Sequence, residues 1–309
     1  MRVAHTLAAH VRQAEQSGRR VRAFAAGTSL SEHGADELPI DTRGFDRVLP
    51  LWEGVRTAAH PEGLVQVECG VRVHALQRWL RARGRMLENT AAFTGQTVVG
   101  ALATASHGTG LGIPPMCDQV VSVVLVTRGG RVVRIEPAVG PTHPDLHDEP
   151  GIELLQDEAL FHAVLTGLGA FGLVAAVTLR TLPAVPLWER RELHTLDQAL
   201  DGPLADPGHV RHASMLFNPM PHDGARAAAV TLRDAADPLH ALDRVRPRQR
   251  LVPTLFGRLP LDVPVRAWMR WRPASAPGIL DTALRSTVRR PLRGAAHRIL
   301  DNWPLNRSA

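Results

Sequence analysis

The sequence predicts an α+β fold, in which helices and strands are mixed along the chain, and three observations support this class. The chain has 309 residues, of which 44% are hydrophobic and 21% are charged, as is typical of a folded protein with a sizeable core. Apolar residues recur at helical spacing in some segments, whereas they alternate or run together in others. Glycine and proline separate these segments at short intervals.

The first predicted elements alternate between helix and strand. Residues 4–17 have the spacing of an amphipathic helix that ends at Gly18. A second helix is predicted over residues 73–83 and ends at Gly84. Between these helices, a turn is expected at 53–54 and strands at 20–25, 39–42, 47–51, 55–59 and 64–69.

The next elements form a hairpin, a helix and a long apolar strand. Residues 119–127 and 131–135 flank Arg128-Gly129-Gly130, which is a hairpin signal. Residues 157–167 predict a helix with Asp157 as its N-cap, and residues 173–182 predict a strand.

The composition changes after Pro183, where proline, arginine and histidine become frequent and periodicity is poor. We recognise only two strand-like stretches beyond this point, at 212–217 and 226–232. The sequence therefore predicts a domain boundary within 183–190.

The charge and composition exclude several classes of protein. The net charge is +6, but the sequence has no lysine and no tyrosine, and its arginines are scattered apart from a cluster between 266 and 298. We therefore expect no nucleic-acid partner. No apolar run approaches the about 18–20 residues of a transmembrane helix, and the N-terminus does not resemble a signal peptide. Two cysteines do not make a disulfide framework, so we expect free thiols and a cytoplasmic protein.

The most informative segment is QTVVGALATASHGTG, from Gln96 to Gly110. It is uncharged apart from His107 and is built from small residues, which let a backbone approach a ligand closely. Free N–H groups in such a loop can bind an anion such as a pyrophosphate. The structural alternative is a buried, alanine-rich helix that ends in a glycine turn.

Other motifs are weaker. Residues 167–172 match GxGxxG, but a helix precedes this motif and a strand follows it, which is the reverse of a dinucleotide-binding unit. Residues 27–31 lack the last glycine of a nucleophile elbow. The run HPDLHDE, residues 143–149, offers no rigid frame for zinc, and we interpret it as a solvated loop without a metal.

Four of these segments, taken in order, resemble the flavin-binding domain of the vanillyl-alcohol oxidase family, which has a PCMH-type FAD-binding domain. They are the loop FAAGTS at 24–29, the segment 96–110, the hairpin VVSVVLVTRGGRVV, and Gly169–Leu179 with its glycines and VTL. The resemblance covers about residues 1–185 and is nearest to the sugar-lactone and alditol oxidase branch. It implies a PCMH-type domain of two α/β subdomains at 1–185, followed by a partial or diverged substrate (cap) domain at 186–309.

The resemblance also implies an FAD site in which backbone N–H groups of two loops bind the pyrophosphate. The implied residues are Ala25, Ala26, Gly27, Thr28, Ser29 and Leu30 of the first loop, Gln96, Thr97, Gly100, Ala101, Thr104, Ala105, Ser106, His107 and Gly108 of the second loop, and Gly172 and Val174 of the late strand. Val174 corresponds to the position that bonds the adenine through its backbone. His107 either caps a tight turn or lies close to the flavin.

Several positions depart from the family pattern. Members with covalent FAD have a histidine where this chain has Thr28, so we expect non-covalent FAD. His33 reads as an ordinary loop residue, and the spacing of Cys117 does not fit a second covalent attachment. Residues 209–219 resemble the start of the substrate domain, but the remainder does not align, and family oxidases extend further. We therefore expect a short, rearranged, partial or degenerate member, and assign no catalytic residue.

Three functions agree with these observations. The first is an FAD-dependent oxidase or dehydrogenase that removes hydride from a CH–OH group of a sugar lactone, polyol or related alcohol, with O2 or another electron acceptor. The second is a flavin reductase or dehydrogenase of the same superfamily with another substrate. The third is a non-catalytic flavin-binding remnant. The HGTG ending favours the first, and Thr28 favours the third.

Overall fold

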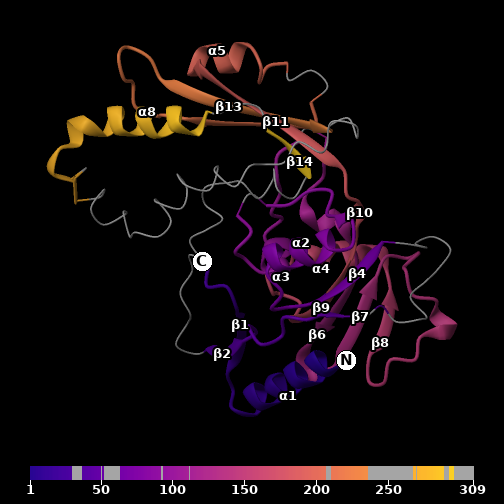
Figure 1. Ribbon diagram of the computed structural model, residues 1–309. Helices are drawn as coiled ribbons and strands as arrows, with labels where there is room; N and C mark the ends of the chain where they lie inside the picture. Colours follow the sequence, from indigo (N-terminus) through magenta and orange to yellow (C-terminus); the bar gives the residue numbers. More distant parts are fainter. Residues whose placement is uncertain are drawn as a thin grey trace. The chain divides into compact units, whose positions relative to one another are not determined.

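The computed structural model describes residues 1–29, 37–49, 51, 63–91, 93–110, 112–206, 210–235, 267–268, 270–288 and 292–295. They belong to two compact units, each with its own main sheet (Figure 1). The first unit contains Met1–Gly108 and Pro114–Pro183, and the second contains Thr109–Ile113 and Ala184–Ala309. The short segment Thr109–Ile113 thus leaves the first unit and groups with the second.

The main sheet of the first unit has six strands. Their order is β3 (Val48–Leu49), β4 (Leu64–Glu68), β9 (Leu173–Arg180), β6 (Val120–Val126), β7 (Val132–Glu136) and β8 (Glu153–Gln156). All neighbours are antiparallel except β7 and β8, which are parallel.

Both faces of this sheet are covered, which explains why β6 is apolar along almost its whole length. Val123 and Leu125 face a core formed with α2 (Val73–Arg81), α3 (Val98–Ala103) and α4 (Glu158–Leu165). Val124 and Val126 face the opposite core, formed with α1 (Arg2–Gln16). Figure 1 shows α1 on one side of the sheet and the other three helices on the other side.

Most predicted elements of this unit are confirmed. The hairpin β6–β7 turns at Arg128–Gly130, where Gly129 and Gly130 have φ of 72° and 71°. Asp157 caps α4, because its Oδ1 accepts a hydrogen bond from Leu160 N at 2.8 Å. The predicted turn at 53–54 and strand at 55–59 lie outside the described residues. Two small sheets complete the unit, β1 (Arg20–Phe24) with β2 (Glu37–Asp41) and β5 (Arg85–Met86) with β10 (Leu182–Pro183).

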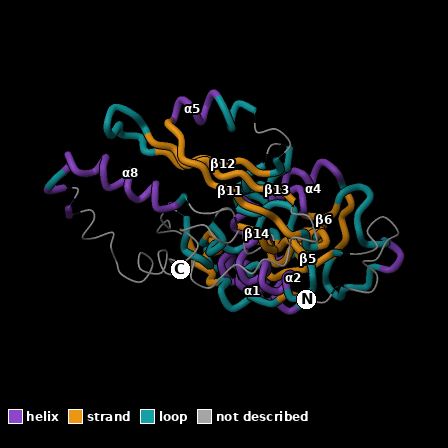
Figure 2. The backbone as a smooth tube through the Cα atoms, turned by 45° about the horizontal axis from the view of Figure 1, so that its top comes forward, coloured by secondary structure: helices purple, strands orange, loops and turns teal. Residues whose placement is uncertain are grey.

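The second unit is an antiparallel sheet with a helix on each face (Figures 1 and 2). The strand order in this sheet is β12 (His212–Phe217), β13 (Ala227–Ala235), β11 (Pro186–Thr195) and β14 (Leu292–Ala295). Ala199 of α5 (Leu196–Asp201) packs on one face, and Leu284 of α8 (Ala276–Thr287) packs on the other. β12 and β13 match the predicted strands, whereas β11, α5 and α8 were not predicted.

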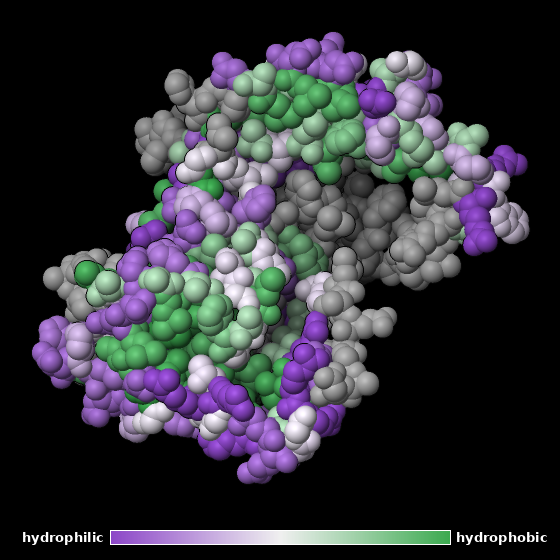
Figure 3. All heavy atoms as spheres, turned by 180° about the vertical axis from the view of Figure 1, so that it is seen from behind, coloured by the Kyte–Doolittle hydropathy of each residue, from purple (hydrophilic) through white to green (hydrophobic). Residues whose placement is uncertain are grey.

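Mixed helix and strand content, the predicted class, is confirmed. On the face drawn in Figure 3, hydrophilic residues are spread between hydrophobic areas and do not form a single band. Within the described ranges, no helix has the length and apolarity that crossing a membrane requires.

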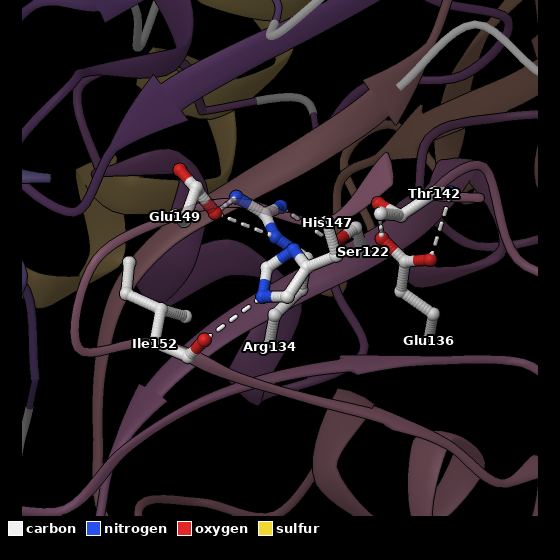
Figure 4. Close-up of polar contacts among 7 residues, drawn as sticks. All are labelled: Ser122, Arg134, Glu136, Thr142, His147, Glu149 and Ile152. Carbon is white, nitrogen blue, oxygen red and sulfur yellow. Dashed lines mark hydrogen bonds and ion pairs between the residues drawn. The ribbon is translucent and has the colours of Figure 1, made fainter. Parts of the chain in front are cut away.

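A buried ion pair fastens the loop between β7 and β8 to the sheet (Figure 4). The Arg134 side chain on β7 is 2% exposed; its Nε donates to Glu149 Oε2 at 2.9 Å, its Nη2 donates to the same oxygen, and its Nη1 donates to Ser122 Oγ at 3.0 Å. Close by, Glu136 is fully buried and accepts from Thr142 Oγ1 at 2.7 Å.

The interpretation of residues 143–149 as a solvated loop is therefore wrong at its end. Glu149 turns into the sheet to neutralise Arg134, and His147 Nε2 lies 2.8 Å from Ile152 O. Among the residues that the structure describes, no group of His, Cys, Asp and Glu is arranged to hold a metal ion.

Substitution of Glu149 tests this ion pair. Glu149→Ala leaves the Arg134 charge buried without a carboxylate, so we expect it to lower the free energy of unfolding by about 3–5 kcal/mol. The control is Glu153→Ala, which breaks the exposed pair with Arg131 and should cost no more than about 1 kcal/mol. Urea denaturation of both variants measures the difference, and equal effects would contradict a stabilising role for the buried pair.

Candidate functional site

The first glycine-rich loop follows β1. Ala25 and Ala26 are half-buried, whereas Gly27, Thr28 and Ser29 are exposed. Gly27 has φ +67°, and no atom of the described residues lies within 4 Å of the place where a Cβ would be. Over the described ranges, the backbone N–H groups of Ala26, Gly27 and Thr28 donate no hydrogen bond, so they are available to an anionic ligand. Leu30, also predicted here, lies outside the described residues.

The second glycine-rich loop begins as a short helix. Thr97 caps α3, because its Oγ1 accepts a hydrogen bond from Gly100 N at 3.1 Å, and its carbonyl accepts one from Ala101 N at 2.9 Å. The helical alternative therefore holds for Val98–Ala103. As a consequence, the amides of Gly100 and Ala101 already have partners inside the protein.

The chain turns back after α3. Thr104 Oγ1 donates to Gly100 O at 3.2 Å, and Ser106 N donates to a carbonyl of α3 at 2.9 Å. Ala105 between them has φ +50°. Gln96, at the start of the loop, donates from Nε2 to Ser106 Oγ at 3.5 Å. These bonds hold residues 96–106 in one compact turn.

His107 and Gly108 follow this turn. The His107 ring is exposed, and its Nδ1 donates to Gly108 O at 2.9 Å. A Cβ on Gly108 would lie 2.1 Å from Asn89 Oδ1 and 2.4 Å from Thr90 O, so only glycine fits here. In the part of the chain that the structure describes, the N–H groups of His107 and Gly108 donate no hydrogen bond.

A series of backbone contacts connects the two loops. Phe24 O, at the end of β1, accepts from Thr42 N at 2.9 Å and from Thr42 Oγ1 at 3.1 Å. Thr42 O lies against Gly70, where a Cβ would be only 2.2 Å away. The next carbonyl, that of Val71, accepts from Val98 N at 2.8 Å where α3 begins. One framework therefore positions both loops.

Gly172 and Val174 lie at the start of the central strand β9. Gly172 has φ +138°, and a Cβ there would lie 2.3 Å from Val126 O. Val174 is opposite Leu125 of β6, whereas the ladder to β4 begins only at Ala176. Because α3 packs against β9, the second loop and the Val174 strand are neighbours in the first unit.

Three residues that hold these loops in place were not predicted from the sequence. Thr42 and Gly70 form the backbone link, and Asn89, which is 3% exposed, contacts Gly108 and donates from Nδ2 to Pro114 O at 3.0 Å. The pair Cys69-Gly70 at the end of a predicted strand is the one local signal that marks a close approach.

Neither cysteine is arranged for chemistry. Both are buried and free. Burial raises the pKa of Cys69 to about 12 and also raises the pKa of Cys117, where Asp118 adds to the effect. Such thiols are poor nucleophiles at neutral pH. His33, which we interpreted as an ordinary loop residue, lies outside the described residues.

Comparison with known proteins adds a family match. Residues 3–136 match the family model described as an FAD binding domain. The chain is 34% identical over 196 residues to L-gulono-1,4-lactone dehydrogenase from Mycobacterium tuberculosis, which is 63% of this chain and 40% of that relative.

Two further relatives are also named as an oxidase or a dehydrogenase of a 1,4-lactone. A D-arabinono-1,4-lactone oxidase from Yarrowia lipolytica is 26% identical over 54% of this chain and 29% of its own length. A mitochondrial L-galactono-1,4-lactone dehydrogenase from Brassica oleracea is 30% identical over 62% of this chain and 28% of its own length. The chain thus matches well under half the length of these relatives.

Substitution of Gly70 tests the link between the loops. Gly70→Ala places a Cβ against the backbone oxygen of Thr42, and backbone cannot move aside as a flexible side chain does. We expect a loss of about 1–3 kcal/mol in the free energy of unfolding. The control is Gly44→Ala, which meets nothing within 4 Å. Thermal melting compares the two variants, and equal melting temperatures would disprove the tight approach.

Proposed function

Because residues 3–136 belong to the FAD binding domain family, of the PCMH type and near the sugar-lactone oxidase branch, we propose that this protein is an FAD-dependent oxidoreductase acting on a CH–OH group of a sugar lactone, polyol or related alcohol. The observation that carries this proposal is the pair of glycine-rich loops in one framework, each with backbone N–H groups that donate no hydrogen bond among the described residues.

The residues of these loops fit a bound pyrophosphate. Its charge requires several N–H donors, and side-chain cations are not needed when backbone amides converge. Ala26, Gly27 and Thr28 supply donors from the first loop, and His107 and Gly108 supply them from the second. The open space at Gly27 leaves room for close approach of the ligand.

The remaining predicted residues support this arrangement in different ways. Thr97, Gly100, Ala101 and Thr104 shape the turn through their internal hydrogen bonds. We propose that the backbone of Val174, at the edge of β9 beyond the β4 ladder, meets the adenine.

Bound FAD supplies a hydride acceptor, and the protein supplies binding and orientation. His107 is held by its own bond to Gly108 O, so we assign it to shaping the loop near the flavin and not to acid–base catalysis. We propose residues 1–185 as the FAD domain and 186–309 as a partial substrate (cap) domain, with O2 or another acceptor completing the cycle. A cytoplasmic location and the absence of a nucleic-acid partner stay predictions.

We propose that FAD is bound without a covalent bond. Thr28 stands where covalent members of the family have a histidine, and a threonine hydroxyl does not form the histidyl–flavin bond. The purified protein should therefore absorb in the visible range, and its flavin should pass into the supernatant when the protein is denatured and precipitated. Flavin that stays with the precipitate would contradict non-covalent binding, and a colourless protein that takes up no added FAD would favour the remnant alternative.

A matched pair of glycine variants tests the first loop. Gly27 and Gly84 have φ of +67° and +65° with open surroundings, so replacement by alanine should cost each about 1 kcal/mol of stability. Only Gly27→Ala should weaken FAD binding, by about tenfold or more, because the loop must distort where it meets the ligand. Titration of the apoprotein with FAD measures the FAD affinity of each variant. Equal FAD affinities of the two variants would place the pyrophosphate elsewhere. A separate turnover screen of the wild-type protein with lactones and polyols identifies the substrate.

A further inference from the structure

The peptide unit that joins Ser106 to His107 has its carbonyl bonded inside the first unit. Ser106 O accepts a hydrogen bond from Met116 N at 3.0 Å. The same peptide unit carries the N–H of His107, for which the described residues supply no acceptor. The described peptide bonds are all trans, so this C=O and this N–H point in opposite directions. The bond to Met116 therefore turns the His107 N–H away from Met116.

Met116 begins the short 3-10 helix η2 (Met116–Gln119), which continues directly into the buried strand β6. The Met116 side chain is fully buried, and its Sδ accepts a hydrogen bond from Ala91 N at 3.3 Å. The end of the second glycine-rich loop is thus held by main-chain atoms at the start of β6. The position of η2 therefore decides where Ser106 O lies.

Gln119, the last residue of η2, bonds a neighbouring stretch of backbone through both ends of its side-chain amide. It is 2% exposed; its Oε1 accepts from Glu88 N at 2.9 Å, and its Nε2 donates to Asn89 O at 2.9 Å. Because a backbone N–H only donates and a carbonyl only accepts, these partners fix which end of the amide is oxygen. An apolar side chain here would leave both backbone groups without these bonds.

One more side chain joins the same two segments. Asn89 Nδ2 donates to Pro114 O at 3.0 Å. Together with the bonds described above, it fixes residues 114–119 on residues 88–91, and each of these bonds uses a side chain of one segment. Both segments and Ser106 belong to the first unit, so the whole arrangement is contained in the unit that carries the two glycine-rich loops.

We propose that Gln119 is a positioning residue for the flavin site: it holds η2 against residues 88–89, and η2 in turn fixes the orientation of the Ser106–His107 peptide. This inference rests on the proposed function of the second loop, in which the His107 N–H binds the pyrophosphate. Without Gln119, η2 keeps its bond to Ser106 but loses its own fixed position. The His107 N–H is then no longer oriented before the ligand arrives, and its contribution to affinity falls.

The test compares two glutamines whose side chains bond backbone carbonyls of the first unit. Gln119→Leu removes the bonds to residues 88 and 89 and keeps a side chain of similar size. The matched control is Gln156→Leu in β8, where Nε2 donates to Thr142 O at 2.7 Å and to Glu136 Oε2 at 3.3 Å. Both variants lose hydrogen bonds inside the same unit, but only Gln119 belongs to η2.

Two quantities are measured on each apoprotein: FAD affinity by titration, and hydrogen exchange at the Met116 amide by mass spectrometry. The Met116 N–H reports directly on the bond to Ser106 O. Pro114 and Pro115 have no amide hydrogen, so in a peptide that begins at these prolines the first amide to exchange is that of Met116.

For Gln119→Leu we expect about tenfold faster exchange at Met116 and about tenfold weaker FAD binding, which is the ratio that loss of one buried hydrogen bond gives. Gln156→Leu should stay within about twofold of wild type in both quantities. Faster exchange with unchanged FAD affinity would overturn the proposal, because η2 would then move without affecting the site. Unchanged exchange at Met116, or an equal loss of FAD affinity in the two variants, would overturn it as well.

Riboflavin distinguishes a pyrophosphate contact from a change in the whole site. It carries the flavin ring without the pyrophosphate, so Gln119→Leu should bind riboflavin within about twofold of wild type. A loss of riboflavin affinity as large as the loss of FAD affinity would overturn the role of Gln119 in orienting the His107 N–H.

Met116→Leu keeps the proposal testable if Gln119→Leu does not fold. This variant retains the main-chain N–H and nearly the same volume, but removes the sulfur that accepts from Ala91 N. We expect exchange at residue 116 to be about threefold faster and FAD binding about threefold weaker, and no change in either would overturn the role of η2. If wild type binds no FAD, the proposed function fails, whereas exchange at Met116 still shows whether Gln119 holds η2.

Discussion

The close approach of two backbones at Gly70 is the constraint on which the site depends. Thr42 O occupies the space where any other residue would place its Cβ, and Thr42 also binds the end of β1 through two hydrogen bonds. On the other side, the chain continues directly into Val71, which holds the start of α3. A ligand that needs donors from two loops requires their spacing to be fixed before it binds. Here the spacing is set by main-chain atoms, which have few alternative positions.

The parts of the fold that the sequence predicted are those with local signals. The β6–β7 hairpin has paired glycines between apolar runs, and α4 begins at a capping aspartate. β11 was not predicted because a charged residue occupies one of its buried positions. Glu189 is 1% exposed and binds Arg233 and Arg191, so a charge occupies a position where the alternating pattern leads one to expect an apolar residue. Such a pair becomes visible only when β13 is placed beside β11.

The same limit explains the candidate site. Gly27 and Gly108 were found because small residues cluster in sequence. Asn89 was not, since it acts on a loop that lies further along the chain and no spacing connects the two. The segment 143–149 was misjudged for a related reason, because Glu149 is buried through its ion pair with Arg134, which lies in the strand before this segment. Residues that position a site are identified by their partners, and these partners are long-range.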